Sequence, residues 1–197
     1  MRLSVIVSDL LTFLPAVFSF FLCKKSQISS SLKFVQVFLA INLPPFLLVD
    51  HGHFQYNCVM LGLTLACVIL ISKGGSNIWL GSISFVLALN FKQMGLYYAL
   101  PIFFFILGKL FTGGKRDRSH GIFNSLSNLG ITALIVIGTF VIIWLPWLTS
   151  TELAGSVLKA VFPFHRGLYH LKVGSVWCVT NFLFNWNVYI LFLNLES

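Results

Sequence analysis

Residues 129–148 read LGITALIVIGTFVIIWLPWL, twenty consecutive positions without one charged side chain. A helix needs about 20 apolar residues to cross the hydrocarbon core of a bilayer, so this stretch predicts a membrane-spanning helix. The composition of the whole chain agrees, because 57% of the 197 residues are hydrophobic and only 9% are charged. Soluble domains carry about 25% charged residues. A water-soluble enzyme, a collagen and a disordered chain are therefore excluded.

Further apolar stretches flank this one on both sides. The stretch at residues 34–49 is short and contains Pro44-Pro45, so we expect a kink or break near Leu43. Together they predict an all-α, polytopic transmembrane bundle that forms one domain over residues 1–197. The seven expected spans are 3–23, 34–49, 56–72, 78–91, 94–111, 129–148 and 176–193.

The charges of the connecting segments predict the orientation of the bundle. The net charge is +8, but the basic residues lie between apolar runs and form no single patch for nucleic acid. The alternating segments 24–33, 73–77 and 109–121 carry eight Lys and Arg residues, and the opposite face carries the other five of the 13. Because cytosolic segments carry the excess of Lys and Arg, we place the first set in the cytosol.

Three polar motifs fall on the opposite, non-cytosolic face. They are DHGHFQYN at 50–57, NFKQ at 90–93 and FPFHRG at 162–167. Ionisable residues so close to hydrocarbon are costly and usually face a cavity or a partner. The sequence therefore predicts that three motifs, distant along the chain, converge at one membrane surface.

The first motif has two interpretations. If the helix continues through it, Asp50, His53 and Asn57 share one helical face. Alternatively, Asp50 caps the start of the third span and the histidines lie at the interface. No metal is expected, since His51 and His53 are two residues apart and do not share a helical face. Asp9 in the first span is either buried and paired or marks a helix end.

The other two motifs offer cations for a phosphate. Lys92 provides a point charge, and Arg166 beside His165 is suited to a bidentate phosphate contact. The alternatives are a turn with a snorkelling lysine and a plain interfacial arginine. The segment around Lys115 is not a phosphate-binding loop, because the first glycine and the final Ser or Thr of that motif are missing.

These strings, with SDLL at 8–11, Tyr97, ALP at 99–101 and Trp177-Cys178, resemble one family in the right order along the chain. They are similar to the endoplasmic-reticulum glucosyltransferases that use dolichyl-phosphate glucose to extend the lipid-linked N-glycan precursor. Gly52 and Lys92-Gln93-Met94 resemble the branch that adds the first glucose to Man9GlcNAc2. The sister enzyme that adds the second glucose is the alternative.

The resemblance implies a multi-pass GT-C-like bundle in the endoplasmic-reticulum membrane, with its active site on the lumenal side. It implies α-1,3-glucosyl transfer without a metal or cofactor, with membrane lipid around the protein and a dolichol-linked donor and acceptor as partners. The substrate-binding candidates are Asp50, His51, His53, Gln55, Asn57, Lys92, Gln93, His165 and Arg166.

The family's catalytic aspartate lies in a first lumenal loop, and the resemblance implies that this chain starts after that loop. We therefore expect a middle portion of a longer transferase that lacks the catalytic base, and we do not assign that role to Asp50. Two alternatives remain from other classes, a non-catalytic truncated membrane protein and a transporter-like bundle. The second requires ionisable residues at mid-span, whereas apart from Asp9 they cluster at span ends here.

Overall fold

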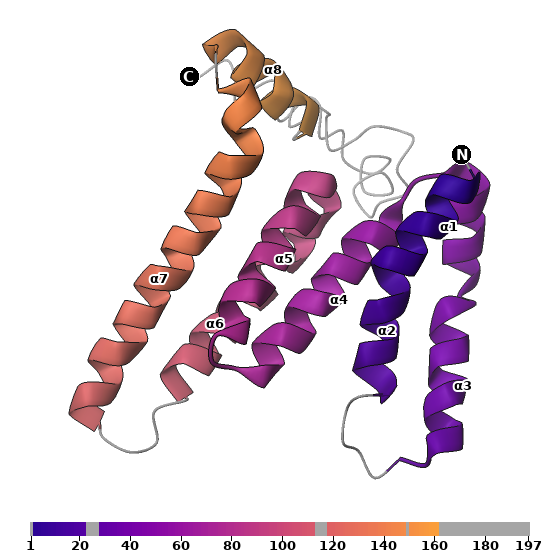
Figure 1. Cartoon of the computed structure of the whole chain (residues 1–197), viewed down its shortest axis with the longest axis horizontal. Coiled ribbons are helices and arrows are strands. Elements are labelled where there is room, and N and C mark those ends of the chain that lie inside the picture. The colour runs from indigo at the N-terminus through magenta and orange to yellow at the C-terminus, as the bar shows by residue number, and fades with distance from the viewer. Residues whose placement is uncertain (1, 23–27, 113–117, 149, 162–197) are drawn as a thin grey trace, which may run out of the picture. The chain divides into compact units, whose positions relative to one another are not determined.

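A computed structural model describes residues 2–22, 28–112, 118–148 and 150–161, and in these ranges the regular structure is helical (Figure 1). The first compact unit is Met1–Ser150, and α8 belongs to the second, Thr151–Ser197. The elements are α1 (Arg2–Leu11), α2 (Phe13–Leu22), α3 (Ser30–Ile41), the π-helical η1 (Phe46–Gly52), α4 (Asn57–Lys73), α5 (Asn77–Phe91), the 3-10 helical η2 (Gln93–Tyr98), α6 (Ala99–Thr112), α7 (Arg118–Trp144), η3 (Leu145–Trp147) and α8 (Thr151–Val161).

The all-α membrane fold predicted from composition is confirmed. Within the described residues, three helices are long and apolar enough to span a bilayer: Leu3–Leu22, Gln93–Phe111 and Phe123–Trp147. A fourth is possible if α3 and η1, which meet at an angle of 47°, form one broken span. That bend confirms the predicted break near Leu43, because α3 ends at Ile41, before Pro44-Pro45.

Four of the predicted spans differ from the described helices or lie outside them. The helix predicted over 129–148 begins earlier, at Arg118, because the polar residues of its first turns extend the helix beyond its apolar part. The predicted span 176–193 lies outside the described residues. The spans predicted over 56–72 and 78–91 appear as the shorter helices α4 and α5, of 17 and 15 residues.

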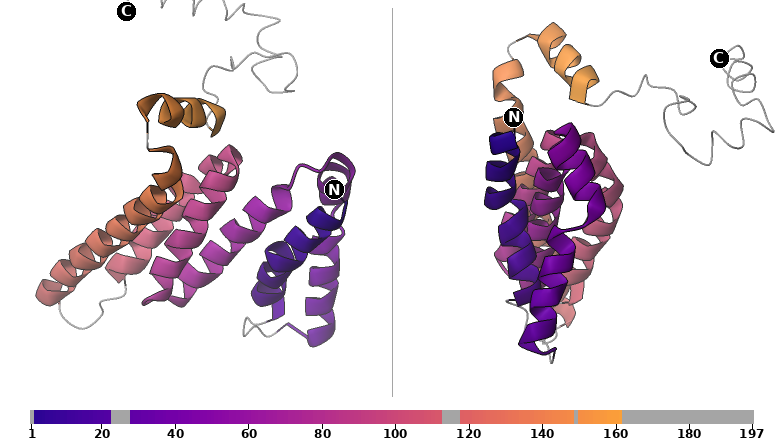
Figure 2. Two further views of the ribbon diagram at one scale, coloured as in Figure 1. Left: turned by 45° about the horizontal axis from the view of Figure 1, so that its top comes forward. Right: turned by 90° about the vertical axis from the view of Figure 1, so that its right-hand side faces the viewer.

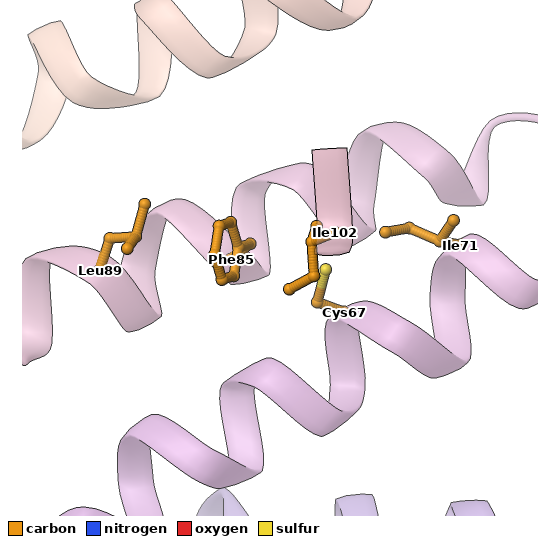
Figure 3. Close-up of a cluster of buried hydrophobic side chains, with 5 residues drawn as sticks. All are labelled: Cys67, Ile71, Phe85, Leu89 and Ile102. Atoms are coloured by element: carbon orange, nitrogen blue, oxygen red, sulfur yellow. The ribbon is translucent and has the colours of Figure 1, made fainter. Parts of the chain in front are cut away.

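The helices α4 and α5 form the centre of the first unit and lie side by side (Figure 2). The turn between them contains Gly74 and Gly75, whose φ angles of 75° and 61° favour glycine. On one side, α2 packs against α4 around Phe13, Val17 and Cys58. On the other, side chains of α4, α5 and α6 form a second buried cluster (Figure 3), composed of Cys67, Ile71, Phe85, Leu89 and Ile102.

Two glycines allow this close packing. A Cβ added at Gly62 of α4 would lie 2.8 Å from the Phe13 Cα of α2. A Cβ at Gly81 of α5 would lie 2.9 Å from Ile71 Cγ1 and 3.1 Å from the Cys67 carbonyl oxygen of α4. Small residues at such contacts let helix backbones approach closely within a membrane.

The substitution Gly62→Ala is expected to destabilise the protein by about 1–3 kcal/mol, because the obstructing atoms belong to the Phe13 backbone and cannot rotate away. Gly138→Ala in α7 is the matched control, since a Cβ there meets no atom within 4 Å. Thermal unfolding in detergent measures the difference. Equal melting temperatures for the two variants would contradict the tight α2–α4 contact.

The helix α8 in the second unit carries charged side chains that complement its helix dipole at both ends. Glu152 lies in its first turn and Lys159 in its last. Acidic residues near a helix N-terminus and basic residues near its C-terminus complement the helix dipole. These charges are consistent with a helix that begins at Thr151 and ends at Val161.

Candidate functional site

Asp50 is fully buried, with 0% of its surface exposed, and both of its carboxylate oxygens are hydrogen-bonded. Oδ1 accepts from Asn57 Nδ2 at 2.7 Å, and Oδ2 accepts from the Cys58 backbone N–H at 2.6 Å. Cys58 lies in the first turn of α4, where N–H groups have no partner within the helix. Asp50 therefore satisfies an N–H of the first turn of α4, but it is not the N-cap residue as the second interpretation had it, because Tyr56 occupies that position.

The competing prediction, one helical face shared by Asp50, His53 and Asn57, is wrong. The helical segment η1 ends at Gly52, and α4 begins only at Asn57. Between them Phe54 and Tyr56 have positive φ angles, 57° and 54°, which interrupt any continuous helix. Such backbone costs about 1–3 kcal/mol per residue and persists only where the surrounding structure holds it.

Lys92 lies close to the turn between η1 and α4, although it is 35 residues from Asn57 along the chain. It follows α5 in an extended conformation, and its Nζ donates to Asn57 Oδ1 and, at 3.2 Å, to the Gln55 carbonyl oxygen. The Asn57 amide thus joins the Asp50 carboxylate to the Lys92 ammonium. We call these three residues the Asp50–Asn57–Lys92 chain.

The bonds of Lys92 to Gln55 and Asn57 test whether the polar motifs converge as predicted. The first two motifs, 50–57 and 90–93, meet through Lys92, as predicted. The third motif, with His165 and Arg166, lies outside the described residues, so its convergence stays a prediction.

His51 pairs with Asp9 of the first span, whose Oδ2 lies 3.1 Å from His51 Nε2. Asp9 is only 8% exposed, so the interpretation of Asp9 as buried and paired is confirmed. The other candidates are less enclosed: His53 and Gln55 are exposed, and Gln93 is half-buried at the start of η2. Gln55 enters the site through its carbonyl oxygen and not through its side chain.

A pocket of about 370 Å³ adjoins the Asp50–Asn57–Lys92 chain. Gln55 and Asn57 form a polar part of its wall, and the rest is mostly apolar or aromatic. The lining residues are Pro45, Phe46, Val49, Gln55, Asn57, Met60, Leu61, Met94, Tyr97 and Tyr98. A site of this kind suits a molecule with one polar and one apolar end.

Comparison with known proteins identifies the family of this chain. The sequence profile of the ALG6, ALG8 glycosyltransferase family matches residues 1–195. The chain belongs to this family. The resemblance drawn from the polar motifs is thereby confirmed.

Individual members of the ALG6, ALG8 family are similar over most of the chain. Relatives from Pongo abelii and Rattus norvegicus are each 41% identical over 92% of the chain, and one from Gallus gallus is 39% identical over 90%. All three are named dolichyl pyrophosphate Man9GlcNAc2 alpha-1,3-glucosyltransferase. The matches cover 34%, 34% and 33% of these relatives, so the chain spans about a third of their length.

This member of the family contains contacts that no motif in its sequence predicts. Ser4 Oγ lies 2.8 Å from the Tyr56 hydroxyl, which ties α1 to the turn after η1. Trp144 Nε1 donates to Asn90 Oδ1 at 2.6 Å, which joins α7 to α5 two residues before Lys92. These partners are 52 and 54 residues apart, so periodicity cannot reveal them.

Proposed function

We propose that this chain forms the donor-binding part of an α-1,3-glucosyltransferase in the endoplasmic-reticulum membrane. The donor is dolichyl-phosphate glucose, and the acceptor is Man9GlcNAc2 linked to dolichol through pyrophosphate. The observation that carries the proposal is the Lys92 ammonium, held beside a mostly apolar pocket. The names of the relatives support the proposed acceptor.

The donor has two chemically different ends, and the pocket region offers a group for each. Lys92 has three N–H groups, two of which donate to Gln55 and Asn57, so a third is available for a phosphate oxygen. Met94, Tyr97 and Tyr98 offer apolar and aromatic surface to the first isoprene units. A soluble sugar nucleotide would have no use for such surface.

The reaction explains why a fixed cation is needed. The acceptor hydroxyl attacks the anomeric carbon of glucose, the bond from that carbon to the phosphate oxygen breaks, and dolichyl phosphate leaves with the electron pair. Negative charge therefore grows on the phosphate, where a preorganised cation stabilises the transition state. The hydroxyl proton requires a base, and Asp50 is unsuited to this because it is fully buried and bonded at both oxygens.

The charge distribution supports a lumenal position of the pocket in this proposal. Lys92 and the 50–57 turn lie on the face opposite the segments rich in Lys and Arg, which we assign to the cytosol. The pocket therefore faces the lumen in this proposal. His165 and Arg166 lie on the same predicted face and are proposed as further contacts to the donor phosphate.

A transfer assay tests the proposed function. Residues 1–195 replace the corresponding third of the Rattus norvegicus relative, and microsomes with this chimera receive labelled dolichyl-phosphate glucose and Man9GlcNAc2 lipid. We expect one glucose to be added to the acceptor. A chimera that inserts into the membrane at the normal level but transfers no glucose, while the parent enzyme does, would contradict the proposal.

Arg166→Ala in the same chimera is expected to raise the KM for dolichyl-phosphate glucose about tenfold, because a charge-assisted contact to phosphate is lost. The protein level should change much less than donor use. Immunoblotting beside the kinetic assay separates the two effects, and Arg118→Ala on the predicted cytosolic face is the control. Parallel loss of protein and donor use would make Arg166 a structural anchor.

A further inference from the structure

The turn that orients Lys92 is itself held by the first helix. Two residues of α1 contact it: Ser4 Oγ lies 2.8 Å from the Tyr56 hydroxyl, and Asp9 Oδ2 lies 3.1 Å from His51 Nε2. They are five residues apart, a little more than one helical turn. One short helix thus contacts both ends of segment 51–56, which contains the two left-handed residues Phe54 and Tyr56.

We propose that Ser4 and Asp9 are positioning residues that act on Lys92 through this segment. The two bonds join Ser4 to Tyr56 and Asp9 to His51, both in this segment. The link is the Gln55 carbonyl, which accepts from Lys92 Nζ at 3.2 Å and belongs to the residue between Phe54 and Tyr56. Holding His51 and Tyr56 fixes the direction of that carbonyl, and hence one of the bonds that orient the ammonium.

The burial of the two contacts differs, and this difference makes them useful as a pair. Asp9 is 8% exposed and packs close to Cys58 in the wall of a second pocket, so its removal affects the packing of α1 as well. Ser4 is exposed, so its hydroxyl can be removed without opening the core. The same effect from both positions would therefore come from the turn that they share.

The proposal rests on the proposed role of Lys92 in donor binding, but its first test does not require activity. The 197-residue chain in membranes is treated with an amine-acylating reagent, and mass spectrometry follows acylation of Lys92. We expect Ser4→Ala and Asp9→Ala each to raise the acylation rate of Lys92 about three- to tenfold. This is the size of effect typical when one hydrogen bond is lost. Exposed Lys73 at the end of α4 is the internal control and should not change.

Matched variants separate positioning from general damage. Ser8→Ala removes a hydroxyl that donates only to the Ser4 carbonyl of its own helix, and it should leave the Lys92 rate unchanged. Ser4→Thr restores a hydroxyl and should restore the original rate. Asp9→Asn keeps an oxygen that accepts from His51, so its Lys92 acylation rate should be close to that of the unmodified chain. Unchanged Lys92 rates in Ser4→Ala and Asp9→Ala, or equal increases at Lys92 and Lys73, would overturn the proposal.

A second readout links the positioning to the ligand. Labelling by a photoreactive dolichyl phosphate should be about three- to tenfold weaker in Ser4→Ala, with no further loss when Ser4→Ala is added to Lys92→Gln. Equal losses in both backgrounds would mean that Ser4 acts independently of Lys92, which overturns the proposal. If the unmodified chain is not labelled at all, the proposed function fails, while the Lys92 acylation rates still decide whether Ser4 and Asp9 position the lysine.

Discussion

Lys92→Gln in the chimeric enzyme is expected to lower the kcat of glucosyl transfer about 10²- to 10³-fold, the loss typical when one preorganised stabilising group is removed. Glutamine can still donate to Asn57 Oδ1 or to the Gln55 carbonyl, so the turn keeps a hydrogen-bond partner. What it loses is the positive charge beside the phosphate that leaves in the reaction. The effect should therefore appear mainly in kcat, with the protein level close to that of the unmodified chimera.

The matched control for this prediction is Lys73→Gln. Lys73 is an exposed lysine at the C-terminal end of α4, on the predicted cytosolic face. The substitution changes the net charge by the same amount far from the pocket along that helix, so transfer should be unaffected. Equal activity of Lys92→Gln and Lys73→Gln would contradict the role of Lys92 in donor chemistry.

Asp50→Ala is expected to have the largest effect on stability, about 3–5 kcal/mol, because it removes one partner from a buried, charge-linked group. The Asn57 amide and the Cys58 N–H would lose their acceptor, and the Lys92 ammonium would lose the carboxylate at the other end of the chain. Little folded protein should remain in detergent after mild heating. Fluorescence-detected size-exclusion chromatography measures this loss.

Asp50→Asn separates the two functions of this carboxylate. Its amide oxygen can still accept from the Cys58 N–H, so much of the cap on α4 should survive. The negative charge that faces Lys92 through Asn57 is lost. The free energy of donor binding should therefore fall by more than the free energy of unfolding. Glu152→Ala, an exposed carboxylate in α8, is the control for charge alone. Asp50→Ala protein as stable as the Glu152→Ala control would contradict the capping role.

Several features of the fold were predictable because they depend on local chemistry. The break at Pro44-Pro45 follows from the missing N–H and fixed φ of proline, and it lies where expected. The three described helices that are long enough to cross a bilayer follow from long runs of apolar residues. The meeting of motifs 50–57 and 90–93 was predictable from topology, because both connect spans at the same membrane surface.

The geometry within the site was not predictable from spacing. A helix through 50–57 was a reasonable hypothesis, but Phe54 and Tyr56 adopt left-handed backbone that aromatic residues rarely occupy. No glycine or proline occurs at those two positions to signal a turn. The conformation depends on tertiary partners, chiefly the bonds of Asp50 to α4 and of Tyr56 to Ser4. The Asp9–His51 pair likewise joins residues 42 positions apart.

Mapping the binding site of a dolichyl phosphate that carries a photoreactive group on its first isoprene unit tests the placement of the donor most directly. We predict that cross-links fall on the pocket wall at Met94, Tyr97 and Tyr98, that excess dolichyl phosphate competes with them, and that Lys92→Gln weakens them. Cross-links spread along the exposed apolar faces of α6 and α7, unaffected by Lys92→Gln or by competitor, would contradict donor binding beside Lys92.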